Sequence, residues 1–191
     1  GRRGRVGSGM GIRGRLEPRV RWMPKVPAPR AYLDGLDPDE EATGLHYADM
    51  LERKIIEEDP ETVLAFFVEP VGGASTGALV PPRGYMERIQ EICREYGVLL
   101  ILDEVMTGAG RTGRFLAGEH WNVQPDIVAM SKGFAAGYVP LGAIAAHDRI
   151  VEPVLDAGGF QHGYTYAGNP LACAAGLAVI GEIEGLDLIA N

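Results

Sequence analysis

The chain has few cysteines and no long apolar run, and these two absences restrict its class. Its 191 residues include two cysteines, Cys93 and Cys173, which are too few and too far apart for a disulfide framework or a zinc site. We expect both to be buried free thiols, as is typical of a reducing compartment. No segment approaches the roughly 20 apolar residues of a membrane span, and the start lacks the apolar core of a signal peptide. The sequence therefore predicts a cytoplasmic protein without a membrane span or a metal site.

Acidic residues are nearly absent from the first thirty positions, which hold eight arginines and one lysine against a single acid, Glu17. Because the whole chain has a net charge of −8, the remaining residues together carry −16. One interpretation of the start is a basic arm that binds RNA or DNA, but no aromatic residue precedes Trp22 to stack on bases. We favour a divergent or truncated N-terminal segment over residues 1–44. The acidic remainder argues against a nucleic-acid binder.

Apolar runs alternate with amphipathic stretches over the rest of the chain. The runs are continuous, as in strands that are buried on both faces, and they lie at 62–70, 98–104, 126–131 and 141–148. Helical periodicity and helix-terminating residues predict helices from about 45 to Pro60, over 82–97, and from Asn169 or Pro170 onward. The alternation predicts an α/β domain over residues 45–191, with a mainly parallel sheet flanked by helices.

The segment "GAGRTG", Gly108 to Gly113, fits the G-x-G-x-x-G pattern of dinucleotide-binding loops. Such a loop begins at the strand end, opens a helix and is followed about 20 residues later by an acid at the end of the next strand. Here several residues separate Leu102 from Gly108, no crossover helix fits after Gly113, and Asp126 opens its strand instead of ending it. We therefore expect glycines that allow a tight turn and a close backbone approach.

Asp103 and Lys132 each follow an apolar run, so each is predicted at the carboxyl end of a strand. Ligands of open parallel sheets bind at these ends. By position alone, Asp103 could simply cap a helix, and Lys132 could be a solvated surface residue. Together, however, a lysine and a strand-end aspartate are the two groups that a pyridoxal cofactor requires, for a Schiff base and for the pyridine nitrogen.

Three ordered motifs make residues 62–180 resemble the class III (omega) aminotransferases, which are pyridoxal-phosphate enzymes of fold type I. These motifs are "VEPVGGASTGALVPPRGYMERIQEICREYGVLLILDEVMTGAGRTGRF", "PDIVAMSKGFAAGYVPLGAIAA" and "HGYTYAGNPLACAAGLA". The resemblance implies the large cofactor-binding domain of such an enzyme, incomplete at both ends and without the C-terminal small domain. It also implies a homodimer that transfers an amino group from an amino acid or omega-amine to a 2-oxo acid such as pyruvate or 2-oxoglutarate.

The resemblance also assigns roles to individual residues. Asp103 would pair with the pyridine nitrogen of pyridoxal 5′-phosphate, and Val105 would pack on the ring. Lys132 would form the Schiff base and move the proton between the substrate and the cofactor. Thr165 would bind the cofactor phosphate in the partner subunit's site, and Glu69 would lie on the substrate side.

Three departures from the family pattern stand out. Met106 occupies a position where most members have glutamine, which hydrogen-bonds the phenolic oxygen of the cofactor, so we list Met106 as a cofactor-binding residue of altered character. The aromatic residue that stacks on the cofactor is absent, since its segment would fall near Arg2 and Arg3. The upstream phosphate-binding loop and the small domain have no counterpart.

Two alternatives to transamination remain open at this point. The chain could be a catalytically incomplete remnant that acts only as a folded dimerisation or binding module. It could also carry another pyridoxal-phosphate reaction, such as that of a decarboxylase, racemase or aminomutase, because these enzymes use the same lysine and aspartate.

Overall fold

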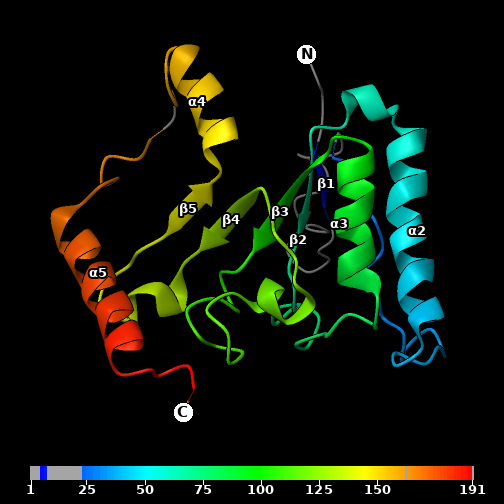
Figure 1. Ribbon diagram of the computed structural model, residues 1–191, viewed down its shortest axis with the longest axis horizontal. Coiled ribbons are helices and arrows are strands. Elements are labelled where there is room, and N and C mark those ends of the chain that lie inside the picture. The colour runs from blue at the N-terminus through cyan, green and yellow to red at the C-terminus, as the bar shows by residue number, and fades with distance from the viewer. Residues whose placement is uncertain (1–4, 8–22, 162, 191) are drawn as a thin grey trace. The chain divides into compact units, whose positions relative to one another are not determined.

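The computed structural model describes residues 5–7, 23–161 and 163–190 of the chain (Figure 1). Most of the arginine-rich start lies outside the described residues, and with it the basic arm that was considered as an alternative and the segment near Arg2 and Arg3. The chain divides into two compact units, which are described separately below. Unit 1 comprises Gly1–Asp103 and Gly118–Pro125, and unit 2 comprises Glu104–Ala117 and Asp126–Asn191.

Unit 1 contains a parallel sheet of three strands. They are β1 (Arg5–Gly7), β2 (Ala65–Val68) and β3 (Leu99–Asp103). β2 is the middle strand and pairs in parallel with both neighbours: Phe66 is opposite Val6 of β1 and opposite Leu100 of β3. β2 and β3 confirm two of the predicted strands, whereas β1 falls in the start of the chain, where composition indicated no strand.

Two helices stand side by side in unit 1 and run in the same direction, each leading into one of the parallel strands β2 and β3 (Figure 1). α2 spans Glu41–Glu57 and α3 spans Tyr85–Glu95. A short 3-10 helix, η2 (Pro60–Thr62), begins where Pro60 was expected to end the first helix. Gly97 lies just beyond the end of α3, as expected for a helix-terminating glycine, and has φ of +63°, a conformation that glycine adopts at low cost after a helix.

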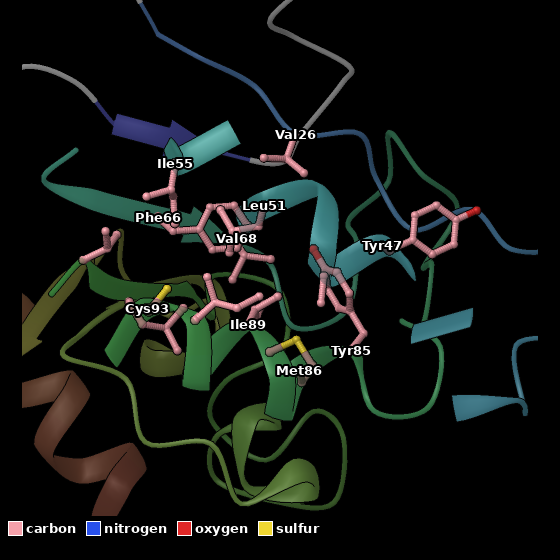
Figure 2. Packing of buried hydrophobic residues seen from close by; sticks show 14 of the residues in the cluster. Val26, Tyr47, Leu51, Ile55, Phe66, Val68, Tyr85, Met86, Ile89 and Cys93 are labelled. Atoms are coloured by element: carbon pink, nitrogen blue, oxygen red, sulfur yellow. The ribbon is translucent and has the colours of Figure 1, made fainter. Parts of the chain in front are cut away.

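The core of unit 1 forms where α2 and α3 pack against β2 and β3 (Figure 2). It is built from the apolar faces of these elements, and its fully buried side chains include Tyr47, Leu51, Phe66, Ile89 and Leu102. Leu51 and Ile55 lie one helical turn apart on α2, which is why the sequence periodicity found this face. Cys93 of α3 belongs to the same core, so it is the buried thiol that the sequence predicted.

Unit 2 contains a strand pair and two helices. Its elements are β4 (Ile127–Met130), the 3-10 helix η4 (Lys132–Ala135), β5 (Ala143–Ala146), α4 (Asp148–Asp156) and α5 (Pro170–Gly185). β4 and β5 pair antiparallel, so the α/β fold is mainly parallel with one antiparallel pair. The glycine loop is followed by a further 3-10 helix, η3 (Ala117–Trp121), which belongs to unit 1 from Gly118 onward; its few residues agree with the expectation that no crossover helix follows the glycine loop.

Two features of unit 2 differ from the sequence-based expectations. α4 was not predicted, because Pro153 lies inside it and proline usually interrupts a helix. Cys173 was expected to be buried, and that prediction is wrong: it lies exposed on α5. α5 is mostly apolar and lacks a distinct polar face, so the sequence could not indicate which side faces the rest of the unit; Gly176 is the buried position.

Candidate functional site

The unit boundary falls at the end of β3, between the two members of the acidic pair. Asp103 is the last residue of β3 and is half-buried. Glu104 begins unit 2, where its amide donates a 2.9 Å hydrogen bond to the carbonyl oxygen of Ala129 in β4. The chain thus passes directly from a strand-end carboxylate to a residue whose backbone is held beside β4.

Glu104, and not Asp103, is the fully buried member of the pair. Its side chain has an exposed fraction of 0% and accepts a hydrogen bond from the hydroxyl of Thr107, which is also buried. A charged or polar side chain is rarely buried without such partners. The two residues together close the turn 104–107. This role could not be predicted from the sequence, because two adjacent acidic residues give no indication of which one is buried.

Two predicted cofactor contacts lie inside this turn. Val105 is half-buried, and Met106 is exposed with 37% of its surface accessible. A methionine thioether is only a weak acceptor and has no donor. The side chain of Met106 is therefore accessible, but it has no group that could donate a hydrogen bond.

The glycine loop that follows is a compact series of turns. The amide of Gly108 donates to the carbonyl of Glu104 at 2.8 Å, and the amide of Ala109 donates to the carbonyl of Phe115 at 2.8 Å. A Cβ on Gly108 would lie 2.8 Å from the carbonyl oxygen of Glu104, and Gly110 has φ of +88°. The glycines thus allow the tight turn and close approach that we expected, and no helix of the dinucleotide-binding kind begins here.

Lys132 begins η4 two residues after β4, and its backbone is unusual. Its φ is +47°, in the left-handed region that non-glycine residues seldom occupy and that often marks a functional position. Its side chain is exposed. The preceding Ser131 donates from Oγ to the carbonyl of Leu141 at 2.6 Å, which attaches the start of η4 to the segment that enters β5.

The segment after Lys132 packs against the glycine loop within unit 2. A Cβ on Gly133 would lie 3.5 Å from the carbonyl oxygen of Gly108 and 3.5 Å from the Cβ of Ala109. With the hydrogen bond from Glu104 to Ala129, this is the second contact that joins the 104–110 segment to the 129–133 segment. Unit 2 therefore brings Val105 and Lys132 onto two neighbouring segments.

Thr165 lies in the turns between α4 and α5 and is exposed. α5 begins a few residues later at Pro170, and the side chain of Asn169 caps it by accepting hydrogen bonds from the amides of Leu171 (3.0 Å) and Ala172 (3.2 Å). This confirms Asn169 or Pro170 as the start of the helix. The hydroxyl of Thr165 is thus presented on the surface of this chain.

Glu69 follows β2 in unit 1, on the loop that leads to α3. It is half-buried, and its Oε2 accepts a 3.2 Å hydrogen bond from the amide of Gly73. The loop is closed further by the amide of Gly72, which donates to the carbonyl of Leu79 at 2.8 Å. Glu69 therefore occupies a defined position at the carboxyl end of β2, as Asp103 does on β3.

Unit 2 also contains a groove of about 780 Å³. The glycine loop, the segment after Lys132, α5 and the chain beyond α5 form its walls, with Gly110, Tyr138, Leu171 and Ile183 among the lining residues. Arg111 and Glu182 are the charged residues on an otherwise mostly apolar lining. Gly133 lines the groove, whereas Lys132 itself does not.

The donor set fits pyridoxal phosphate chemically. An exposed lysine amine can form a Schiff base, a strand-end carboxylate can hold a protonated pyridine nitrogen, and a hydroxyl such as that of Thr165 can donate to a phosphate. Among the described residues there is no group of three or more His, Cys, Asp or Glu side chains that could hold a metal ion. Asp103 and Lys132 fall in different units, so their pairing around one cofactor remains a prediction.

Comparison with known proteins decides the family. The family model for class III aminotransferases matches residues 6–191. The chain belongs to the class III aminotransferase family. This family is dependent on pyridoxal phosphate, and the resemblance seen in the three sequence motifs is thereby confirmed.

Relatives and solved structures of this family of aminotransferases resemble the chain closely. An omega-aminotransferase of Caulobacter vibrioides is 46% identical over 152 residues, which are 78% of this chain and 34% of the relative. A putrescine–pyruvate aminotransferase of Pseudomonas aeruginosa is 40% identical, over 80% of this chain and 33% of its own. The solved (S)-enantioselective omega-transaminase of Thermomicrobium roseum matches with a TM-score of 0.88 and 37% identity, over 97% of this chain and 45% of its own.

A second solved structure is informative about the cofactor. The omega-transaminase of Pseudomonas jessenii in complex with PMP matches with a TM-score of 0.88 and 33% identity, over 97% of this chain and 46% of its own. These matches confirm the predicted α/β fold.

The chain spans about a third of the length of the curated relatives it matches. No helix among the described residues is both long and apolar enough to cross a membrane.

Proposed function

We propose that this chain forms the cofactor-binding part of a pyridoxal-phosphate-dependent aminotransferase. The observation that carries the proposal is Lys132: a lysine in a left-handed backbone conformation, with an exposed side chain, whose neighbour Gly133 packs against the turn that follows Asp103. Strained backbone is kept where the surrounding structure imposes it, and active sites are a common place for it. Membership of the class III family supports the same assignment.

In this proposal Lys132 holds the cofactor through its amine and, once released, moves a proton at the substrate carbon. A neutral amine is required for both tasks. Bound pyridoxal phosphate supplies an electron sink for the pair that is left when the substrate's Cα–H bond breaks. The carboxylate of Asp103 keeps the pyridine nitrogen protonated, and Val105 covers the ring with an apolar surface.

Thr165 is proposed to contribute to the partner subunit's site in a homodimer. Its segment and α5 carry large apolar side chains that this chain leaves uncovered, including Tyr166, Leu171 and Leu177, each at least 70% exposed. Exposed apolar surface of this extent is typical of an interface. A homodimer would cover it and would bring the exposed hydroxyl of Thr165 to a second subunit's phosphate.

The proposed reaction transfers the amino group of an amino acid or an omega-amine to a 2-oxo acid. The names of the relatives support this range: one is an omega-aminotransferase, and another uses putrescine and pyruvate. The solved relatives are described as omega-transaminases. Pyruvate is therefore the first acceptor to assay, with 2-oxoglutarate as the second.

Absorbance of the lysine-bound cofactor tests the first half of the proposal. The chain has three lysines, at positions 25, 54 and 132, so the test has matched controls. Pyridoxal phosphate should give a visible absorbance band with the wild-type chain, with Lys25→Ala and with Lys54→Ala, and no band with Lys132→Ala. A band that persists in Lys132→Ala would refute the assignment of this lysine.

One alternative is favoured by a specific observation. Because the chain spans about a third of its curated relatives, it could bind the cofactor without turnover, as a dimerisation or binding module. A half-reaction assay separates the two: conversion of bound pyridoxal phosphate to its amino form by an added amine supports transamination. Release of carbon dioxide or racemised substrate would instead indicate a decarboxylase or a racemase.

A further inference from the structure

Glu104 is a buried acid that the proposed chemistry does not use. Its side chain has an exposed fraction of 0%, although moving a carboxylate from water into a protein interior is unfavourable unless hydrogen bonds compensate for the lost solvation. One use of such a group is to fix a single conformation of the chain around it. The contacts of Glu104 within unit 2 indicate which conformation it fixes.

The segment from Glu104 to Gly108 forms one helical turn that does not continue into a helix. The amide of Gly108 donates to the carbonyl of Glu104 at 2.8 Å, with the four-residue spacing of an α-helix. Residues three apart in such a turn lie on the same side. Glu104 and Thr107 have this spacing, both are buried, and the hydroxyl of Thr107 donates to the carboxylate of Glu104. The other side of the turn carries Val105, which is half-buried, and Met106, which is exposed.

The two ends of this turn contact the chain on both sides of Lys132. At its start, the amide of Glu104 donates a 2.9 Å hydrogen bond to the carbonyl oxygen of Ala129, three residues before the lysine. At its end, the carbonyl oxygen of Gly108 lies 3.5 Å from the position that a Cβ on Gly133 would occupy, and Gly133 directly follows the lysine. All of these residues belong to unit 2. The conformation of the turn therefore sets where its outward side chains lie relative to Lys132.

We propose that Glu104 is a positioning residue of the cofactor site. By accepting the hydrogen bond of Thr107 inside the protein, its carboxylate holds the turn in one conformation and keeps Val105 in a fixed position relative to Lys132. The inference rests on the proposed function, in which Lys132 binds the cofactor and Val105 packs on its ring. Glu104 acts through Val105, since its own side chain is buried on the opposite side of the turn.

Substitutions of Thr107 test this role. Replacing Glu104 itself would leave the buried hydroxyl of Thr107 without its acceptor and could prevent folding. Thr107→Val keeps the shape of the side chain but removes the hydroxyl, whereas Thr107→Ser keeps the hydroxyl. Tyr47→Phe is the matched control in unit 1, because the hydroxyl of Tyr47 also donates to a carboxylate, that of Asp34, at 2.5 Å. It removes the same kind of hydrogen bond outside the turn.

Amide hydrogen exchange in the full chain without cofactor is the first measurement. The amides of Glu104 and Gly108 report on the turn, because they donate to the carbonyls of Ala129 and Glu104. Their exchange rate, relative to that of amides within α5, should be about five- to tenfold higher in Thr107→Val than in wild type. Thr107→Ser and Tyr47→Phe should leave this ratio unchanged. An equal ratio in Thr107→Val and Tyr47→Phe would overturn the proposal.

Visible circular dichroism of the bound cofactor is the second measurement. The signal per unit absorbance of lysine-bound pyridoxal phosphate depends on how firmly the ring is held in its asymmetric surroundings, and not on how much protein has bound it. This signal should decrease in Thr107→Val and stay at the wild-type value in Thr107→Ser and Tyr47→Phe. A purely structural role of the hydrogen bond would lower the amount of bound cofactor but leave the signal per unit absorbance unchanged, and that result would overturn the positioning role.

Failure of this inference and failure of the proposed function give different results. A wild-type chain without the absorbance band, or a band that persists in Lys132→Ala, counts against the proposed function. A wild-type band with the same circular dichroism per unit absorbance in every variant counts only against Glu104 as a positioning residue. Amide exchange is measured without cofactor, so in either case it decides whether the hydrogen bond between Thr107 and Glu104 fixes the turn.

Discussion

The backbone amide of Glu104 donates a 2.9 Å hydrogen bond to the carbonyl oxygen of Ala129. Through this bond, the residue that follows Asp103 is held against β4, three residues before Lys132. The hydroxyl of Thr107 donates to the buried carboxylate of Glu104, and this hydrogen bond closes the turn 104–107 that follows.

Replacing Thr107 by valine should destabilise the turn, because the shape is kept but the hydroxyl that donates to the buried carboxylate of Glu104 is lost. Leaving a buried acceptor short of a donor costs about 1–3 kcal/mol. Urea unfolding of Thr107→Val measures the loss. Thr165→Val is the matched control, since Thr165 is exposed, and it should change the free energy of unfolding by less than about 0.5 kcal/mol. Equal stability of the two variants would contradict the role of Thr107.

Gly108→Ala should both destabilise the chain and weaken cofactor binding. Its new methyl group would meet the carbonyl oxygen of Glu104 at 2.8 Å, so the turn has to shift, at a cost of roughly 1–3 kcal/mol. Thermal unfolding and the absorbance of lysine-bound pyridoxal phosphate are the measurements. Gly181→Ala is the control: it lies in α5 with open space around its Cβ position and should be neutral or stabilising.

Replacing Asn169 by alanine should shorten or destabilise α5. The side chain of Asn169 accepts hydrogen bonds from the amides of Leu171 and Ala172, and loss of such a cap costs about 1 kcal/mol. Circular dichroism at increasing temperature measures the effect. Asn169→Asp keeps an acceptor at the cap and should restore most of the stability. An alanine variant as stable as the aspartate variant would show that the cap is dispensable.

One of the two thiols should react in the folded chain. Cys173 is exposed and Cys93 is buried, and burial raises the pKa of the Cys93 thiol to about 12, so its reactive thiolate is scarce at neutral pH. A thiol-reactive chromogenic disulfide should titrate a single cysteine in the native protein and both in denaturant. Cys173→Ser should abolish the fast reaction and Cys93→Ala should not. A homodimer that covers α5 would slow the reaction of Cys173 in proportion to the dimer present.

Stability should fall at alkaline pH. Burial raises the pKa of Cys93 to about 12, and burial together with the hydrogen bond to Asp34 raises the pKa of Tyr47 to about 12. Both groups are neutral acids in the folded chain and ionise earlier when unfolded, from their ordinary pKa values of 9.0 and 10.0. The unfolded state therefore releases more protons, and the stabilising contribution is complete below pH 9 and declines as the pH rises towards 12.

Urea unfolding at a series of pH values between about 8 and 11 measures this slope. Cys93→Ala removes one of the titrating groups, so its stability should depend less steeply on pH over this range, whatever its absolute stability. A slope unchanged by the substitution would contradict the assignment of the alkaline loss to the Cys93 thiol.

Much of the fold could be predicted from local patterns. The apolar runs correspond to β2, β3, β4 and β5, and the amphipathic stretches correspond to α2 and α3. These elements were predictable because the spacing of apolar residues along the sequence indicates both the type of element and its buried face. α4 was missed because Pro153 argues against a helix by a local rule. The antiparallel pairing of β4 with β5 was missed as well, since a continuous apolar run indicates burial but not direction.

The candidate site, like the fold, could be predicted only in part from the sequence. The sequence by itself determined the residue types of the site, a lysine and an aspartate at strand ends, and the motifs that place the chain in its family. Only the tertiary structure decided that Glu104 is the buried acid, that Lys132 has a left-handed backbone and that Cys173 is exposed. These facts depend on which segments pack together, and packing between residues distant in the chain leaves no periodic trace in the sequence.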